Sequence, residues 1–138
     1  MRFAFALLLV AGTLAAAPVP KDFKRADDKE LLVGTWKPAD TGSAHFRFNP
    51  DGTMQTWNGR NAGNPVDWTW TNLDPKTTPK RVTLTRTVGS GTYDCIYELN
   101  GDGFKLAFII DKTRPLPDKL AAAPGLSFYD LAREKPAK

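Results

Sequence analysis

The stretch RVTLTRTVGSGTYDCIYELNGDGFKLAFII, residues 81–110, decides the fold class of this chain. It contains runs of alternating side chains at 81–88, 92–99 and 104–110, each of a length typical of one β-strand. The segments GSG and NGDG between the runs are typical hairpin connectors, because glycine and asparagine tolerate the positive φ that tight turns need. The stretch therefore predicts three consecutive antiparallel strands.

One face of these strands is expected to be apolar, since side chains at every second position of a strand point the same way. Cys95, the only cysteine, lies in this row between two tyrosines, so we expect a core residue and no intramolecular disulfide. The row expected to face inward consists of Val82, Leu84, Arg86, Val88, Tyr93, Cys95, Tyr97, Leu99, Phe104, Leu106, Phe108 and Ile110.

The rest of the chain beyond residue 30 continues the same pattern, with Gly, Pro, Asn and Asp between short runs. About eight such strands in series either stack as a sandwich or close into an up-and-down barrel. We predict an all-β fold, a lipocalin-like antiparallel up-and-down barrel. The further strands are expected at 31–37, 44–48, 53–58, 65–73 and 126–133.

The N-terminus has the layout of a secretory signal peptide: Arg2, an apolar run to Val10, then small residues up to Ala17. The apolar run is too short to span a bilayer, and a buried N-terminal helix is the alternative. We expect export to the periplasm or outside the cell, with no transmembrane segment in the mature chain. The expected divisions are a signal peptide over 1–17, cleaved near 15–17, a lead-in segment over 18–30 with a short helix, a barrel over 31–134 and a tail over 135–138.

Charge and residue types argue against several functions. The chain has 19 Lys and Arg against 15 Asp and Glu, but the basic residues are scattered among acids instead of forming a stripe that neutralises phosphates. His45 is the only histidine, which excludes a two-histidine metal site, and VGSGT is not a nucleophile elbow. We expect no nucleic-acid partner, no catalytic residues, no metal and no cofactor, and a monomer; a glycosidase-like carboxylate pair stays open.

Gly34 and Trp36 form a Gly-x-Trp motif near the first expected strand, and Arg133 ends the last one. In these residues the chain resembles the lipocalins. The resemblance implies that Trp36 plugs the closed end of a barrel and that Arg133 packs across it through a cation–π contact and hydrogen bonds to carbonyls. Gly34, Trp36 and Arg133 are therefore expected to be structural.

Over residues 31–134 the chain is also similar to a family of small, mostly secreted, uncharacterised domains of planctomycete bacteria. The matching motifs are LVGTW (32–36), DPKTTPK (74–80), IYELNGDGFKL (96–106), Arg114-Pro115 and the closing basic strand at 131–134. This resemblance implies an exported lipocalin-like barrel and implies no activity.

Connectors in an up-and-down barrel alternate between its ends, so the sequence also locates an opening. Those at 38–43, 58–64, 89–91 and 111–125 share one end, and we expect the mouth there because it has the longest loop. A small apolar or anionic-headed molecule is the expected partner. The expected wall residues are Trp57, Trp68 and Tyr93, and the residues expected to hold a polar head are Arg86 and Arg114.

Two alternatives remain at this point. A buried arginine is costly unless it is paired, so Arg86 could instead reach solvent at the rim or pair with Asp67 or Asp94. The tryptophans could fill the barrel as core residues, which would favour a cell-envelope interaction or scaffold domain with a filled core and no ligand.

Overall fold

The computed structural model describes residues 27–59, 62–110 and 113–135. The signal peptide expected over 1–17 lies outside the described residues, as do 18–26 of the lead-in segment and 136–138 of the tail. Within the described ranges, one short helix precedes eight strands. Their bounds are α1 Asp28–Leu32, β1 Gly34–Pro38, β2 Ala44–Phe48, β3 Thr53–Asn58, β4 Val66–Asp74, β5 Lys80–Arg86, β6 Thr92–Asn100, β7 Gly103–Ile109 and β8 Leu126–Arg133.

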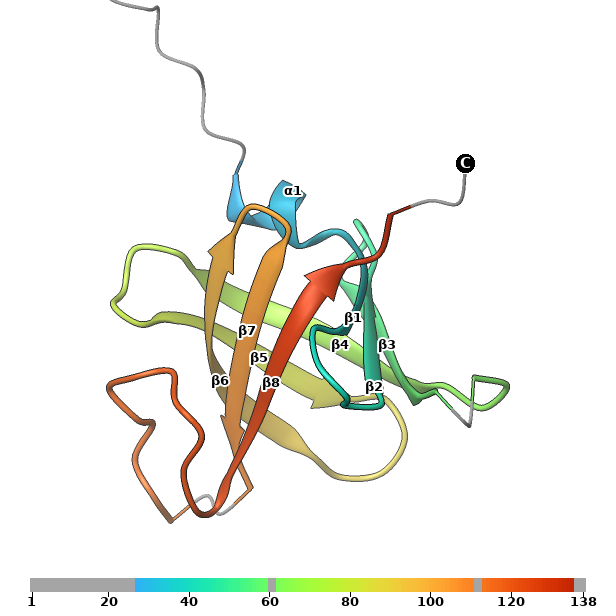
Figure 1. Cartoon of the computed structure of the whole chain (residues 1–138). Helices are drawn as coiled ribbons and strands as arrows, with labels where there is room; N and C mark the ends of the chain where they lie inside the picture. The colour runs from blue at the N-terminus through green and yellow to red at the C-terminus, as the bar shows by residue number, and fades with distance from the viewer. Residues whose placement is uncertain (1–26, 60–61, 111–112, 136–138) are drawn as a thin grey trace, which may run out of the picture.

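The strands close into one antiparallel barrel in sequence order (Figure 1), which confirms the predicted fold class. Each strand pairs antiparallel with the next, and β8 returns to pair with β1. The β1–β8 seam is short, with Cα partners from Trp36↔Arg133 to Pro38↔Leu131. We call the end with α1 and the 49–52, 75–79 and 101–102 connectors the closed end, and the opposite end the open end.

Three sequence-based expectations are wrong at element ends. The first strand begins at Gly34 because Leu31 and Leu32 belong to α1. Val88 and Ile110 were expected to face inward, but they are 78% and 63% exposed. Strand β5 ends at Arg86 and β7 at Ile109. Beyond the last paired residue of a strand the backbone turns, so the two-residue alternation no longer predicts which way a side chain points.

The interior at the closed end is filled by large side chains. The ring centroids of Trp36 and Phe104 lie 5.2 Å apart, and those of Phe48 and Phe104 lie 5.6 Å apart. Leu32, from α1, is fully buried in the same cluster. Because burial of such side chains is worth about 1.5–3 kcal/mol each, this half of the barrel provides much of the stability.

Arg133 lies across Trp36 at this end, where the sequence expects it. Its guanidinium carbon is 4.3 Å from the Trp36 ring centroid, and it donates hydrogen bonds to the carbonyls of Val33 (2.9 Å) and Leu31. The Trp36 indole nitrogen donates to the Leu32 carbonyl at 2.9 Å. These contacts join the first strand, the last strand and the end of α1 in one cluster.

Helix α1 is tied across the closed end by one carboxylate. Asp28 accepts hydrogen bonds from Lys80 Nζ at 2.7 Å and from the Tyr97 hydroxyl at 2.8 Å. Burial, and then the hydrogen bond to Asp28, raise the pKa of Tyr97, so its hydroxyl stays a proton donor. The helix is thereby held to β5 and β6, and Figure 1 shows it lying over this end of the barrel.

The long connector after β7 lies along the outer wall of the barrel. Leu116 borders a depression with Asp94 of β6, and Leu120 borders another with Glu98 of the same strand. Ile96, on the outward face of β6, is fully buried. The described part of the connector, 113–125, therefore lies against the outer wall at Leu116 and Leu120.

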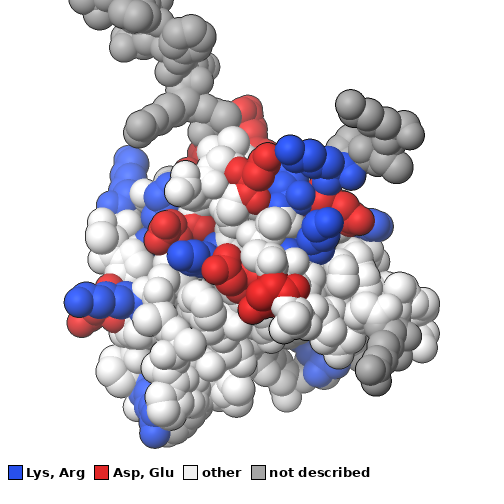
Figure 2. Space-filling model, viewed as in Figure 1, with Lys and Arg blue, Asp and Glu red and all other residues white. Residues whose placement is uncertain are grey.

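Acidic and basic side chains are interleaved on the surface. Glu98, Lys105 and Asp130 are cross-strand partners on β6, β7 and β8, so opposite charges face one another along this wall. In Figure 2, charged groups of both signs gather over the half nearer the closed end, whereas the half nearer the open end is largely uncharged. This view shows no continuous basic stripe of the kind that binds nucleic acid.

The buried thiol of Cys95 confirms its expected place in the core. Burial, and then the nearby carboxylate of Asp94, raise the pKa of Cys95, which keeps the reactive thiolate scarce even at mildly alkaline pH. We expect iodoacetamide to leave the native protein unmodified and to alkylate it fully in guanidinium chloride, as measured by intact mass. Rapid alkylation of the native protein would contradict the packing of β6.

Candidate open-end cavity

A cavity of about 210 Å³ opens at the end of the barrel where the sequence predicts the mouth. Its lining includes Ala44 at the start of β2, Asn58 at the end of β3 and Tyr93 near the start of β6. These positions adjoin three of the connectors assigned to the mouth. The barrel is thus filled at one end and hollow at the other.

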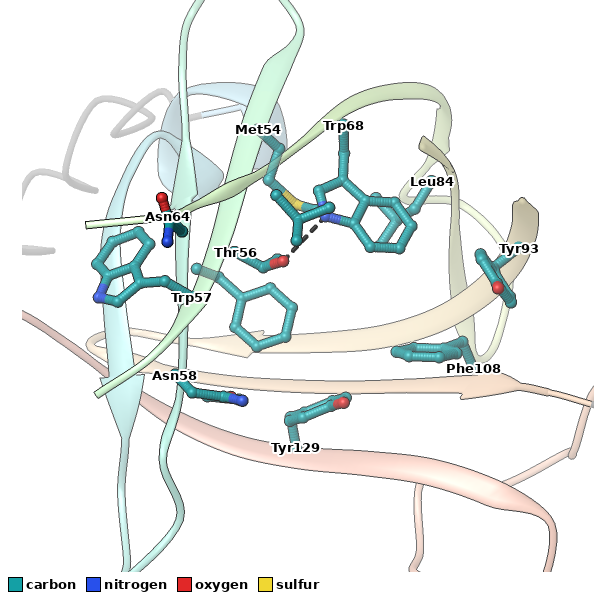
Figure 3. A pocket seen from close by; sticks show the side chains of 13 residues that line it. Met54, Thr56, Trp57, Asn58, Asn64, Trp68, Leu84, Tyr93, Phe108 and Tyr129 are labelled. Carbon is teal, nitrogen blue, oxygen red and sulfur yellow. Dashed lines mark hydrogen bonds between the residues drawn. The ribbon is translucent and has the colours of Figure 1, made fainter. Parts of the chain in front are cut away.

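Five aromatic side chains form a continuous arc around the cavity. Neighbouring ring centroids are separated by 5.0 Å (Phe46–Tyr129), 5.7 Å (Tyr129–Phe108), 5.3 Å (Phe108–Tyr93) and 5.9 Å (Tyr93–Trp68). The rings come from β2, β8, β7, β6 and β4. In Figure 3, Trp68 lies across the void from Phe108 and Tyr129, with Tyr93 at the side. We call this set the aromatic arc.

The polar groups of the cavity are few and neutral. Trp68 Nε1 donates a hydrogen bond to Thr56 Oγ1 at 2.9 Å, which fixes the edge of the indole (Figure 3). Among the described residues, the lining includes no charged side chain. The other lining residues are Asn58 and Asn64, which carry amides, Ala44, Met54, Val66 and Leu84, which are aliphatic, and Trp57.

The two phenols of the arc add hydroxyl groups without adding charge. Burial raises the pKa of Tyr129, because a phenolate would lose its hydration there. The hydroxyl therefore stays protonated and able to donate a hydrogen bond at neutral pH. A molecule in the cavity would meet ring faces, methyl and methylene groups, and a small number of neutral hydrogen-bonding groups.

Two of the sequence-predicted wall residues, Trp68 and Tyr93, come together in the aromatic arc. Trp57 only borders the cavity: its ring stacks on His45 at 5.4 Å and lies 5.3 Å from the guanidinium carbon of Arg47. Figure 3 shows the Trp57 ring turned away from the void. On β3, Met54 is buried and points inward, and Thr56, two residues further on, points the same way. Trp57 is the next residue, so its side chain points to the outer face.

Arg86 is exposed at the rim of the open end, as one of the two alternatives predicts. Its guanidinium carbon is 5.9 Å from the Trp68 ring centroid. Neither predicted carboxylate partner holds it, since Asp67 accepts from Gln55 at 2.9 Å and Asp94 from Thr83 at 3.2 Å. Across the described parts of the chain, Arg86 forms no ion pair.

Arg114 lies apart from the cavity lining. Its guanidinium donates a hydrogen bond to the Pro124 carbonyl at 3.2 Å, across the long connector. It also borders a shallow depression on the outer side of the barrel together with Tyr93 and Leu116. The structure therefore places Arg114 as a contact within the connector and not among the residues that line the cavity.

Sequence reasoning missed several residues of the cavity as site residues. Two-residue alternation places Phe108 on an inward row. The same alternation, applied to the expected strands at 44–48, 53–58 and 126–133, would have added Phe46, Thr56 and Tyr129. Asn64 lies in a connector outside the strands, where no periodicity applies.

The described residues contain no group of three or more His, Cys, Asp or Glu side chains that could hold a metal ion. No helix that they form is long and apolar enough to cross a membrane. Comparisons with protein-family models, with curated proteins and with solved structures found no match to this chain, so the two family resemblances stay predictions.

Proposed function

We propose that this chain is an exported binding protein that holds one small, largely apolar molecule in the open end of its barrel. The observation that supports this proposal is the hollow, aromatic-lined cavity of about 210 Å³ in a barrel whose other end is filled. Ligand pockets usually measure about 300–1,000 Å³, so this cavity lies below that range and suits only a small ligand. Export rests on the signal-peptide pattern of residues 1–17.

The chemistry of the wall favours a ligand over water. A water molecule needs two to four polar partners to be held well, and the aromatic arc and the aliphatic side chains provide few. An apolar group that displaces such water gains contact with the rings of Trp68 and Phe108 without leaving a buried charge unpaired. The same hollow argues against a scaffold domain whose core is filled throughout.

Filling the cavity tests this function. Ala44 lines the cavity, and the next residue, His45, packs on Trp57 outside it. We expect Ala44→Phe to weaken the binding of a neutral fluorescent dye such as N-phenylnaphthylamine by about tenfold or more, because the new ring occupies the void. The matched variant His45→Phe should change the dissociation constant by less than about twofold. Fluorescence titration measures both, and unfolding midpoints check that both variants are folded.

Native mass spectrometry of the protein purified from its own host supplies an independent test. We expect a population of the folded chain to carry one bound small molecule. A spectrum of bare chain alone, together with no binding of the dye by the parent protein, would overturn the proposed function.

A further inference from the structure

We propose that the cavity recognises the quaternary ammonium group of a small zwitterion, whose anionic group is bound by Arg86 at the rim. This inference rests on the proposed function, because it concerns the same cavity. It starts from the aromatic arc, where five rings surround a space that has no charged lining side chain among the described residues.

The faces of aromatic rings carry partial negative charge, and tryptophan and tyrosine attract cations most strongly. Trp68, Tyr93 and Tyr129 supply three such rings, with two phenylalanines between and beside them. Figure 3 shows rings on opposite sides of the void, Trp68 on one side and Phe108 and Tyr129 on the other. A cation in the void would contact several rings at once, as in an aromatic cage.

The shortage of acceptors selects the kind of cation. A primary ammonium has three N–H donors, which would lose their water on entering the cavity. The Thr56 hydroxyl already accepts a hydrogen bond from Trp68, and no carboxylate lies in the described lining. The other side-chain acceptors of the lining are neutral: the amide oxygens of Asn58 and Asn64 and the two phenol oxygens. A trimethylammonium group has no donors to satisfy, and its methyl groups fit against Met54 and Leu84. The wall therefore favours a quaternary over a primary amine.

The charges around the cavity require a partner for that cation. The chain has a net charge of +4, so a bare cation would enter a repulsive field without a counter-charge. Arg86 lies next to the arc, with its guanidinium carbon 5.9 Å from the Trp68 ring centroid, and it makes no ion pair with the described residues. A carboxylate or phosphate joined to the ammonium by a short linker would reach this guanidinium and accept a two-point hydrogen bond.

The test compares zwitterions with isosteres in which carbon replaces the charged nitrogen. Glycine betaine is paired with 3,3-dimethylbutanoate, and phosphocholine with 3,3-dimethylbutyl phosphate, in calorimetric titrations of the whole chain. We expect at least one zwitterion to bind about tenfold tighter or more than its isostere, since only the zwitterion makes the cation–π contacts. The pair that shows the difference identifies the anionic group as carboxylate or phosphate.

The outcomes separate this inference from the proposed function. Isosteres that bind as tightly as their zwitterions, or tighter, would overturn the inference and leave an apolar binding site in place. Zwitterions that fail to bind while the neutral dye binds would do the same. Absence of binding by the zwitterions, the isosteres and the dye would overturn both proposals.

A pair of arginine variants tests the role of the rim. Arg86 and Arg47 both lie over a tryptophan, at 5.9 and 5.3 Å from the ring centroid. Trp68, under Arg86, belongs to the aromatic arc, whereas Trp57, under Arg47, only borders the cavity and stacks on His45. We expect Arg86→Gln to weaken binding of the zwitterion by about tenfold, and Arg47→Gln to change it by less than about twofold. Equal affinities for the parent protein and Arg86→Gln would remove Arg86 from the site.

Discussion

Replacing Trp36 by alanine will lower the free energy of unfolding by about 3–5 kcal/mol, the range found for truncation of large aromatic side chains in cores. The Trp36 side chain is fully buried, its ring contacts Phe104, and its indole nitrogen donates a hydrogen bond to the Leu32 carbonyl. Truncation would leave a void at the closed end and an unsatisfied carbonyl. Urea unfolding followed by circular dichroism measures the loss. A variant as stable as the parent would show that Gly34-x-Trp36 matches the lipocalin motif by chance.

A double-mutant cycle shows how much of this loss belongs to the contact with Arg133. We expect Arg133→Ala to cost less than Trp36→Ala, and the double variant to lose about 0.5–2 kcal/mol less than the sum, because the guanidinium–indole contact is counted in both single variants. Arg47 and Trp57 form the same kind of pair on the exposed outer face. Their cycle provides the matched control and should give the smaller coupling. Additive losses for Trp36 and Arg133 would contradict the shared contact.

Replacing Gly34 by alanine will have the second largest effect, a loss of about 2–4 kcal/mol in the free energy of unfolding. Two causes act together. Gly34 has a φ of 135°, which side chains rarely adopt, and a Cβ at this position would lie 2.7 Å from an Arg133 guanidinium nitrogen. The arginine would have to move off Trp36 and release the Val33 carbonyl. Urea unfolding again measures the change.

A second glycine separates backbone strain from the clash. Gly89 also has a positive φ, 90°, and a Cβ there would meet nothing within 4 Å. Gly89→Ala should therefore cost only the strain, about 1–2 kcal/mol. In an Arg133→Ala background the clash is absent, so Gly34→Ala should lose less than it does in the parent protein. Equal losses in the two backgrounds would show that the close approach of Arg133 has no energetic consequence.

The two ends of the barrel differ in packing, and in the proposed function the closed end provides stability while the open end provides the binding site. The closed end contains the filled core, the Trp36–Arg133 contact and the carboxylate of Asp28 that ties down α1. With the strands held there, the open end can keep a void lined by rigid aromatic rings. A binding site built on strands in this way holds its geometry better than one built on loops.

The sequence by itself determined the strands, their order and the two ends of the barrel. Alternation in the stretch 81–110 predicted β5, β6 and β7 to within two residues at each end, and Gly- and Asn-containing turns predicted the hairpins. The mouth followed from the connectors alone, since up-and-down connections must alternate ends. Cys95 could be assigned to the core for the same local reason: period-two alternation depends only on neighbours along the chain.

Only the tertiary structure decided which side chains meet and where space remains. The aromatic arc joins rings from five strands, and the register between strands sets which rings become neighbours. Trp57 and Trp68 look alike in sequence, but one packs outside on His45 and the other inside. Arg86 occupies an inward-facing position in the alternation of β5, but its side chain is exposed to solvent, because the strand ends at this residue, at the rim. A void is the difference between the volume that the barrel encloses and the volume of the side chains inside it, and no local pattern encodes that difference.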